Sequence, residues 1–137
     1  MNGTTGYLTA WSSISEHHII YNISYALHRN SMTTLSRDSC NELVNRSVGY
    51  PLPTDKFCIY NQHNVKACRG DSGGGFFVKR KYTTKYHGND EYLLLGVLSN
   101  VPRSDHDCSL DTVVAMTDLH YHYQFIYREM QKDVRIY

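Results

Sequence analysis

The sequence predicts a mostly β fold, a closed barrel or a sandwich, that ends in a single α-helix. Six short runs rich in aromatic, aliphatic and β-branched residues are separated by polar segments, as in strands joined by loops. No repeat or low-complexity tract interrupts this order. The apolar residues take up helical spacing only near the carboxyl end. A closed arrangement of six strands would leave no strand edge exposed.

The expected strands follow one another along the whole chain. They cover residues 7–11, 23–27, 57–60, 76–79, 92–99 and 113–117. The three prolines, Pro51, Pro53 and Pro102, fall in the loops between them. At 137 residues the chain is long enough for one compact domain with a core and too short for two ordinary ones.

The carboxyl end changes to helical spacing. The apolar residues that form one face of the expected helix are Leu119, Tyr123, Ile126, Tyr127 and Met130. Asp118 stands before this face, where an aspartate can cap the helix. His120 and His122 alternate along the same segment, and alternate residues diverge on a helix. We therefore expect surface histidines, and neither a metal site nor another cofactor.

Charge and hydropathy exclude two classes of partner. Fourteen basic and thirteen acidic residues leave a net charge of +1, which produces no broad field to hold nucleic acid or an anionic membrane. The longest apolar stretch, residues 92–98, is interrupted by Gly96. It is much shorter than the roughly 20 residues that a membrane-spanning helix needs. The chain is expected to bind neither nucleic acid nor membrane.

Cysteines and glycosylation sequons point to an extracellular protein. The four cysteines form an even set, and Asn-x-Ser/Thr sequons occur at Asn2, Asn22 and Asn45. The amino terminus lacks the basic and apolar regions of a secretory signal, so we expect the signal outside this chain. A cytosolic β domain with four free thiols is the alternative. It conflicts with the three sequons.

One glycine-rich segment carries the candidate chemistry. Gly70, Ser72 and Gly74 satisfy the Gly-x-Ser-x-Gly pattern, which a merely flexible turn could also show. The nucleophile elbow of α/β-hydrolases needs a buried strand before the serine and a long helix after it. Residues 61–66 are polar instead, and residues 75–78 look like the start of a strand. The flanks thus favour a serine held in a loop that leads into a strand.

The residue types of this loop suit acyl transfer. A serine nucleophile needs two backbone N–H groups aimed at the developing oxyanion, and losing one such donor costs about 3 to 4 kcal/mol of barrier. The N–H groups of Gly70 and Ser72 can supply them. Gly73 and Gly74 would let the chain pack closely behind the serine, and Cys68 would clamp the loop from outside.

These motifs, in this order, resemble the carboxyl half of chymotrypsin-like (trypsin-fold, family S1) serine proteases. The motifs are Cys68-Arg69-Gly70-Asp71-Ser72-Gly73-Gly74, Leu95-Gly96-Val97-Leu98-Ser99, Cys108 and Phe125-Ile126. Residues 6–11, Ser39-Cys40 and Lys56-Phe57-Cys58 extend the resemblance over nearly the whole chain. It implies a six-stranded antiparallel Greek-key barrel closed by a carboxyl-terminal helix. Residues 1–137 would be the second barrel of a domain whose amino-terminal barrel is absent from this chain.

The family pattern also implies roles for individual residues. Ser72 would be the nucleophile, the N–H groups of Gly70 and Ser72 the oxyanion hole, and Ser99 the start of the substrate-binding strand. Asp71 would order the loop by pairing with an amino terminus released on activation. The implied disulfides, Cys40 with Cys58 and Cys68 with Cys108, are one of the three pairings that four cysteines allow.

Two features of the sequence resemble a narrower group of proteases. Position 75 holds glycine where the family usually has proline, and residues 79–90 form a long insert. Both are similar to the modular and clip-type proteases of arthropod haemolymph cascades. The partners that this implies are a protein substrate or another member of an extracellular cascade.

Several positions depart from the family pattern. No histidine has the Ala-Ala-His-Cys context of the catalytic base, and His63 or His87 as a surrogate would need an orienting partner. Lys66 replaces the aspartate that binds a basic substrate side chain, so cleavage after Arg or Lys is not expected. Val101 and Val114 stand near glycine sites and would narrow the specificity pocket.

Two functions therefore remain open. The first is a serine endopeptidase domain that is incomplete here and inactive as an isolated chain. The second is a non-catalytic serine protease homologue that acts as a protein-binding module in an extracellular cascade. Residues 69–71 also spell the adhesion tripeptide Arg-Gly-Asp, which works on exposed loop tips. The family pattern instead places the aspartate inside the protein.

Overall fold

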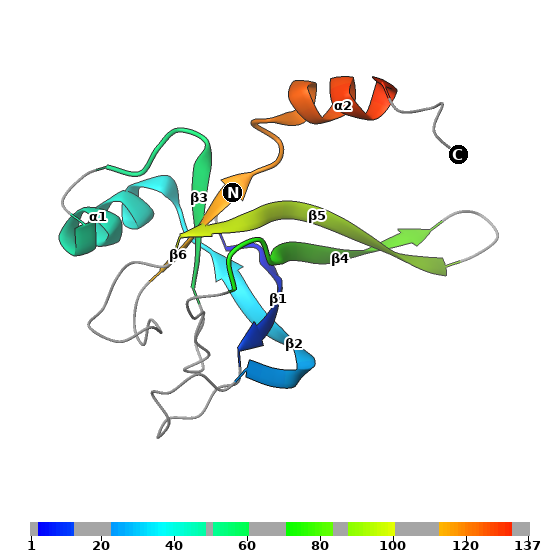
Figure 1. Cartoon of the computed structure of the whole chain (residues 1–137), viewed down its shortest axis with the longest axis horizontal. Coiled ribbons are helices and arrows are strands. Elements are labelled where there is room, and N and C mark those ends of the chain that lie inside the picture. The colour runs from blue at the N-terminus through cyan, green and yellow to red at the C-terminus, as the bar shows by residue number, and fades with distance from the viewer. Residues whose placement is uncertain are drawn as a thin grey trace.

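The computed structural model describes residues 3–12, 23–48, 51–60, 71–83, 88–100 and 113–132. They form six strands and two helices (Figure 1). The strands are β1 (Thr5–Ser12), β2 (Ile23–Thr34), β3 (Lys56–Tyr60), β4 (Gly75–Thr83), β5 (Gly88–Asn100) and β6 (Val114–Asp118). The helices are α1 (Arg37–Val48) and α2 (Tyr123–Lys132).

The six strands close into an antiparallel barrel. Their order around the barrel is β1-β2-β3-β6-β5-β4, and every pair of neighbours is antiparallel. The first three strands lie side by side and β4 returns to lie beside β1, which is the Greek-key connection. The predicted fold class, an all-β six-stranded barrel followed by a carboxyl-terminal helix, is confirmed.

Three strands, β2, β4 and β5, extend well beyond the apolar runs that predicted them. β2 continues to Thr34, and its polar second half still alternates, with Met32 and Thr34 buried and Ser31 exposed. The predicted insert at 79–90 is the outer part of a hairpin, in which β4 and β5 stay paired as far as Thr83 and Gly88. Pairing with a neighbouring strand, rather than local hydrophobicity, sets these lengths.

The sequence did not predict α1. Its first turn is capped by Ser36, whose Oγ accepts a hydrogen bond from the Ser39 N–H at 3.2 Å. Among the residues of α1 whose burial is described, 37–45, Cys40 and Val44 are the buried apolar ones, and they lie one helical turn apart. That stripe is too short, in an otherwise polar segment, to stand out as a helical period.

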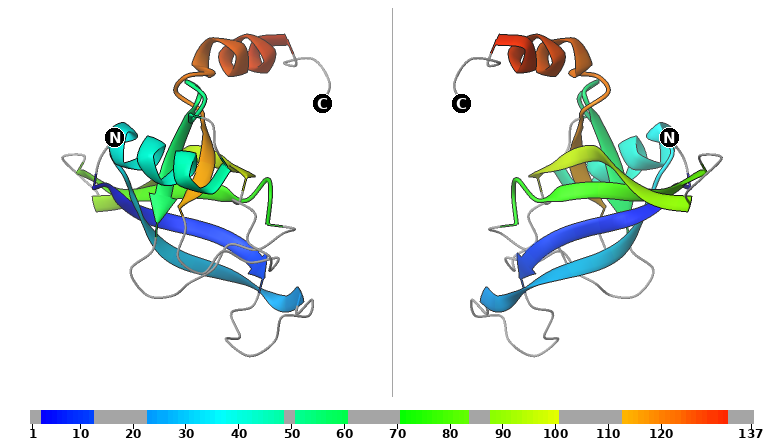
Figure 2. Two further views of the ribbon diagram at one scale, coloured as in Figure 1. Left: turned by 90° about the vertical axis from the view of Figure 1, so that its left-hand side faces the viewer. Right: turned by 90° about the vertical axis from the view of Figure 1, so that its right-hand side faces the viewer.

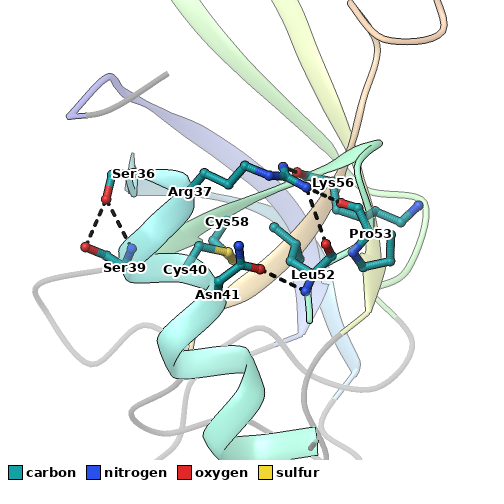
Figure 3. The surroundings of a disulfide bond; sticks show 9 residues. All are labelled: Ser36, Arg37, Ser39, Cys40, Asn41, Leu52, Pro53, Lys56 and Cys58. Atoms are coloured by element: carbon teal, nitrogen blue, oxygen red, sulfur yellow. Dashed lines mark hydrogen bonds between the residues drawn. A yellow bond between two sulfur atoms is a disulfide. The ribbon is translucent and has the colours of Figure 1, made fainter. Parts of the chain in front are cut away.

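The apolar core has two parts. Eight buried side chains fill the barrel: Leu8, Met32, Phe57, Ile59, Phe76, Leu98, Val114 and Met116. A second cluster lies under α1 and consists of Cys40, Val44, Leu52, Cys58 and Val113. The disulfide between Cys40 and Cys58 joins α1 to β3 within this cluster (Figure 3). This pairing is the first of the two that the family resemblance implied.

The carboxyl-terminal helix starts later than predicted. Residues 119–122 form a turn, and α2 begins at Tyr123. Asp118 therefore caps the turn rather than the helix, because its Oδ1 accepts the His120 N–H at 2.9 Å. Figure 2 shows α2 beyond one end of the barrel, and none of its ten described residues is buried. No helix among the described residues is long and apolar enough to cross a bilayer.

Candidate active site

Ser72 lies at the corner of a tight turn that leads into β4. The Gly74 N–H donates to the Asp71 carbonyl at 2.9 Å, and Gly73 has a φ of 90°. This hydrogen bond and the positive φ at the third position are typical of a type II turn, in which only glycine is unstrained there. Ser72 is exposed, whereas the neighbouring Asp71 is only 5% exposed.

Backbone hydrogen bonds tie this turn to β5. The Gly73 N–H donates to the Leu98 carbonyl at 2.9 Å, and the Leu98 N–H donates to the Gly74 carbonyl at 2.8 Å. Leu98 is itself part of the barrel core. The backbone that carries Ser72 is therefore held against a buried strand. This excludes the alternative that the Gly-x-Ser-x-Gly pattern is a merely flexible turn.

The two glycines after the serine serve different purposes. A Cβ at Gly74 would lie 2.6 Å from the Thr9 carbonyl oxygen of β1, so the chain does pack closely behind the serine. A Cβ at Gly73 would meet nothing within 4 Å, and glycine is needed there for its φ alone. Thr9, which sequence reasoning missed, also donates from its hydroxyl to the Gly75 carbonyl at 3.3 Å. A threonine in an ordinary strand gives no sequence signal for this role.

Two of the predicted substrate-binding residues are described. Ser99 follows Leu98 on β5 and is half-buried, so it lies one residue beyond the backbone that holds the serine turn. Val114 begins β6, faces Ile59 of β3, and is 2% exposed within the barrel core. The Val114 side chain therefore lies in the barrel interior.

Other predicted site residues lie outside the described residues. They are Lys66, Cys68, Gly70, Val101 and Cys108, the sequon residues Asn2 and Asn22, and the histidines His63 and His87. Asn45, the remaining sequon asparagine, is exposed on α1. Within the described ranges, no three His, Cys, Asp or Glu side chains are grouped so that they could hold a metal ion.

The burial of Asp71 also bears on the Arg-Gly-Asp tripeptide. A carboxylate that is 5% exposed is not presented at a loop tip to an adhesion partner. In this turn the Asp71 side chain points into the protein, whereas the Ser72 hydroxyl is accessible from outside. Such a hydroxyl, on a backbone fixed by the barrel, is positioned to meet a substrate carbonyl if a base is provided.

Comparisons with known proteins agree with this geometry. A family model described as Trypsin matches residues 1–117. A protein named modular serine protease, from Drosophila melanogaster, is 34% identical over 84 residues, which are 61% of this chain and 13% of that protein. The solved structure of neuropsin, a serine protease expressed in the limbic system of mouse brain, superposes with a TM-score of 0.68 at 17% identity. That match covers 95% of this chain and 49% of neuropsin, so the chain spans about half the length of that relative.

Proposed function

Because the chain belongs to the trypsin family of serine proteases, we propose that it carries the nucleophile of a serine endopeptidase, Ser72. The observation that supports this most directly is the exposed Ser72 on a turn fixed to the core strand β5. The Ser72 Oγ would attack a peptide carbonyl as a base takes its proton. The base would return the proton to the amine, which leaves as the tetrahedral intermediate collapses to the acyl-enzyme. Water would then hydrolyse this ester, which releases the acid and restores Ser72. The N–H groups of Gly70 and Ser72 would bind the oxyanion.

The base would come from a second β-barrel. We propose that residues 1–137 are the carboxyl-terminal barrel of the protease domain and that an amino-terminal barrel supplies the catalytic His and Asp. The length comparison supports this, since the matched part is 49% of the neuropsin chain. The isolated 137 residues would then have no oriented base. An unactivated serine hydroxyl is a weak nucleophile, so we expect no hydrolysis by this chain alone.

Exposed apolar side chains on α2 support such a partner. Tyr123, Tyr127 and Met130 recur at helical spacing on one stripe, and all three are exposed. The rings of Tyr123 and Tyr127 stack with their centroids 5.9 Å apart. A stripe of this kind on a helix without buried residues is typical of a surface that another domain covers.

The outer face of the barrel carries a second apolar group. The rings of Tyr7, Phe77 and Tyr92 follow one another across β1, β4 and β5, with centroids 5.7 Å apart in each pair. Tyr92 is exposed, and so is Leu94, which lies two residues farther along β5. This row lies on the same strands that hold the serine turn, which again suits burial against a second barrel.

A non-catalytic protease homologue is the second candidate. It is favoured by Val114, whose side chain is packed in the core where a pocket glycine is usual, and by Lys66 and Val101 in the sequence. Such a protein would keep the barrel and bind a cascade partner without turnover. The same substitutions would also suit an active protease that prefers small or acidic side chains.

Labelling with a fluorophosphonate separates the two functions. The test uses the full-length protein, including any barrel upstream of this chain. If the site is active, Ser72 Oγ displaces fluoride from phosphorus and forms a phosphonate ester in stoichiometric amount. Ser72→Ala abolishes labelling, whereas Ser31→Ala, which alters an exposed serine of β2, leaves it unchanged. A folded full-length protein without labelling would favour the non-catalytic homologue.

We further propose that the protein is secreted and glycosylated. The Cys40–Cys58 disulfide and the exposure of Asn45 on α1 support this. Protein recovered from secreting cells is then expected to lose mass on treatment with an N-glycosidase, with Asn45→Gln removing one glycan. Four free thiols in that material would instead support a cytosolic domain.

A further inference from the structure

The described part of α2 has few ties to the barrel. Two backbone hydrogen bonds hold the residues just before it: the Asp118 N–H donates to the Asp55 carbonyl at 2.9 Å, and the Leu119 N–H to the Leu95 carbonyl at 3.1 Å. Beyond Leu119, the described hydrogen bond that reaches back to the barrel joins His122 Nε2 to Asp55 Oδ2 at 3.0 Å. This contact lies one residue before the helix begins.

The direction of that hydrogen bond follows from the carboxylate. An ionised carboxylate can only accept, so the Nε2 of His122 carries the hydrogen. Donation from His122 holds the pKa of Asp55 below its ordinary value, against the opposing effect of partial burial. The Lys56 ammonium, 3.4 Å from the same oxygen, lowers that pKa further. Asp55 therefore remains an acceptor throughout the neutral range.

Asp55 is itself held by α1. The Arg37 guanidinium donates to three backbone carbonyls on the two sides of Asp55, those of Leu52, Pro53 and Lys56, at 3.3, 2.8 and 3.0 Å (Figure 3). The Cys40–Cys58 disulfide fixes α1 to β3 beside this segment. The backbone that carries the Asp55 carboxylate is thus held in place by these contacts. It differs in this from an exposed ion pair, in which both side chains are free to move.

Among the residues that the structure describes, the other charged and polar groups near His122 have contacts of their own. Lys56 Nζ donates to Thr117 Oγ1 at 2.8 Å, and Asp118 Oδ1 accepts the His120 N–H at 2.9 Å. The Tyr121 ring contacts the His122 imidazole edge-on, with centroids 5.2 Å apart. Each neighbour has a partner or a role of its own, which leaves Asp55 as the acceptor for His122.

We propose that Asp55 is an anchor that sets the direction in which α2 leaves the barrel. The Ile126 N–H donates to the His122 carbonyl at 3.0 Å, so His122 is joined through the backbone to the first turn of α2. Holding His122 thereby determines where Tyr123, Tyr127 and Met130 point. Without the Asp55 acceptor, α2 swings about the turn at 119–122 while the barrel stays folded. This inference does not require the protease to be active.

Residual dipolar couplings of backbone amides in the 137-residue chain test the anchor. In the unmodified protein, the α2 couplings fit the alignment tensor that is determined from the barrel strands. In Asp55→Ala they no longer fit it, although the barrel couplings do. Glu129→Ala is the matched control, because the described ion pair of Glu129, with Lys132 at 2.7 Å, lies within α2. It removes one carboxylate and leaves the fit intact.

A second variant guards against a folding defect in the first. His122→Ala removes the donor from a turn outside the barrel and is expected to release α2 in the same way. Intact α2 couplings in a folded Asp55→Ala protein, or in His122→Ala, would overturn the anchor. So would an equal loss of fit in Glu129→Ala, because that would make α2 sensitive to any lost carboxylate.

Discussion

Gly74 and Thr9 approach each other so closely that a Cβ at position 74 would stand 2.6 Å from the Thr9 carbonyl oxygen. The obstacle is backbone of β1, which cannot turn aside as a side chain can. Since the Leu98 N–H also donates to the Gly74 carbonyl, the turn cannot move away without losing a hydrogen bond to β5. This contact is what fixes the serine turn against the barrel.

We therefore expect Gly74→Ala to destabilise the protein by about 1 to 3 kcal/mol, the usual cost of overpacking. Urea unfolding followed by circular dichroism measures the change. Gly88→Ala is the control, because a Cβ at Gly88 meets nothing within 4 Å and its φ is not positive. A Gly74→Ala protein as stable as Gly88→Ala would show that β1 and the turn can separate at little cost.

Gly73 predicts a different pattern of substitution. Its Cβ position is open, so the cost of a side chain comes from the φ of 90° rather than from crowding. Gly73→Ala is expected to lose about 1 kcal/mol, and Gly73→Asn less, because asparagine tolerates positive φ better than alanine. The same unfolding measurement compares the two variants. Equal losses would mean that crowding, not backbone strain, limits this position.

The sequence predicted the strands and the serine turn because both have local signals, whereas the choice of a barrel over a sandwich came from the family resemblance. Strand runs, polar loops and the glycine pattern around Ser72 can each be recognised within about ten residues. α1 could not be recognised in this way, because within residues 37–45 its buried face consists of Cys40 and Val44 alone. The late start of α2 was also hidden, since Asp118 suits a turn as well as a helix cap.

The sequence carried no signal for contacts between residues that lie far apart along the chain. Thr9 reaches Gly75 across 66 positions, and His122 reaches Asp55 across 67. Neither residue type is unusual in its own segment, so only the closed barrel reveals that they meet. The histidine that the sequence predicted as a plain surface residue thus takes part in holding α2, although it remains partly exposed.

The Cys40–Cys58 disulfide should contribute a large share of the stability. It closes a loop with a sequence separation of 18 and joins α1 to the second core cluster. The chain-entropy estimate for a loop of this size is about 3 kcal/mol. We expect Cys40→Ala/Cys58→Ala to lower the free energy of unfolding by about that amount, measured by urea unfolding. Amide exchange should rise first in α1, and unchanged exchange there would contradict the role of the disulfide in holding this helix.

Acid should release α2 through Asp55. The pKa of this carboxyl is lower in the folded chain than in the unfolded one, chiefly because His122 donates to it. Its contribution to stability is therefore fully present above the ordinary aspartate pKa of about 3.9 and is lost as the pH falls through the lower folded-state value.

The measurement follows the α2 dipolar couplings and the Asp55 carboxyl carbon shift in one acid titration of the full chain. Both are expected to change together, below the ordinary aspartate range, while the barrel couplings persist. Asp55→Ala shows no such step, since its α2 is already free. Release of α2 in the range where histidines titrate would contradict this prediction, because an ionised Asp55 accepts from the neutral as well as the protonated imidazole.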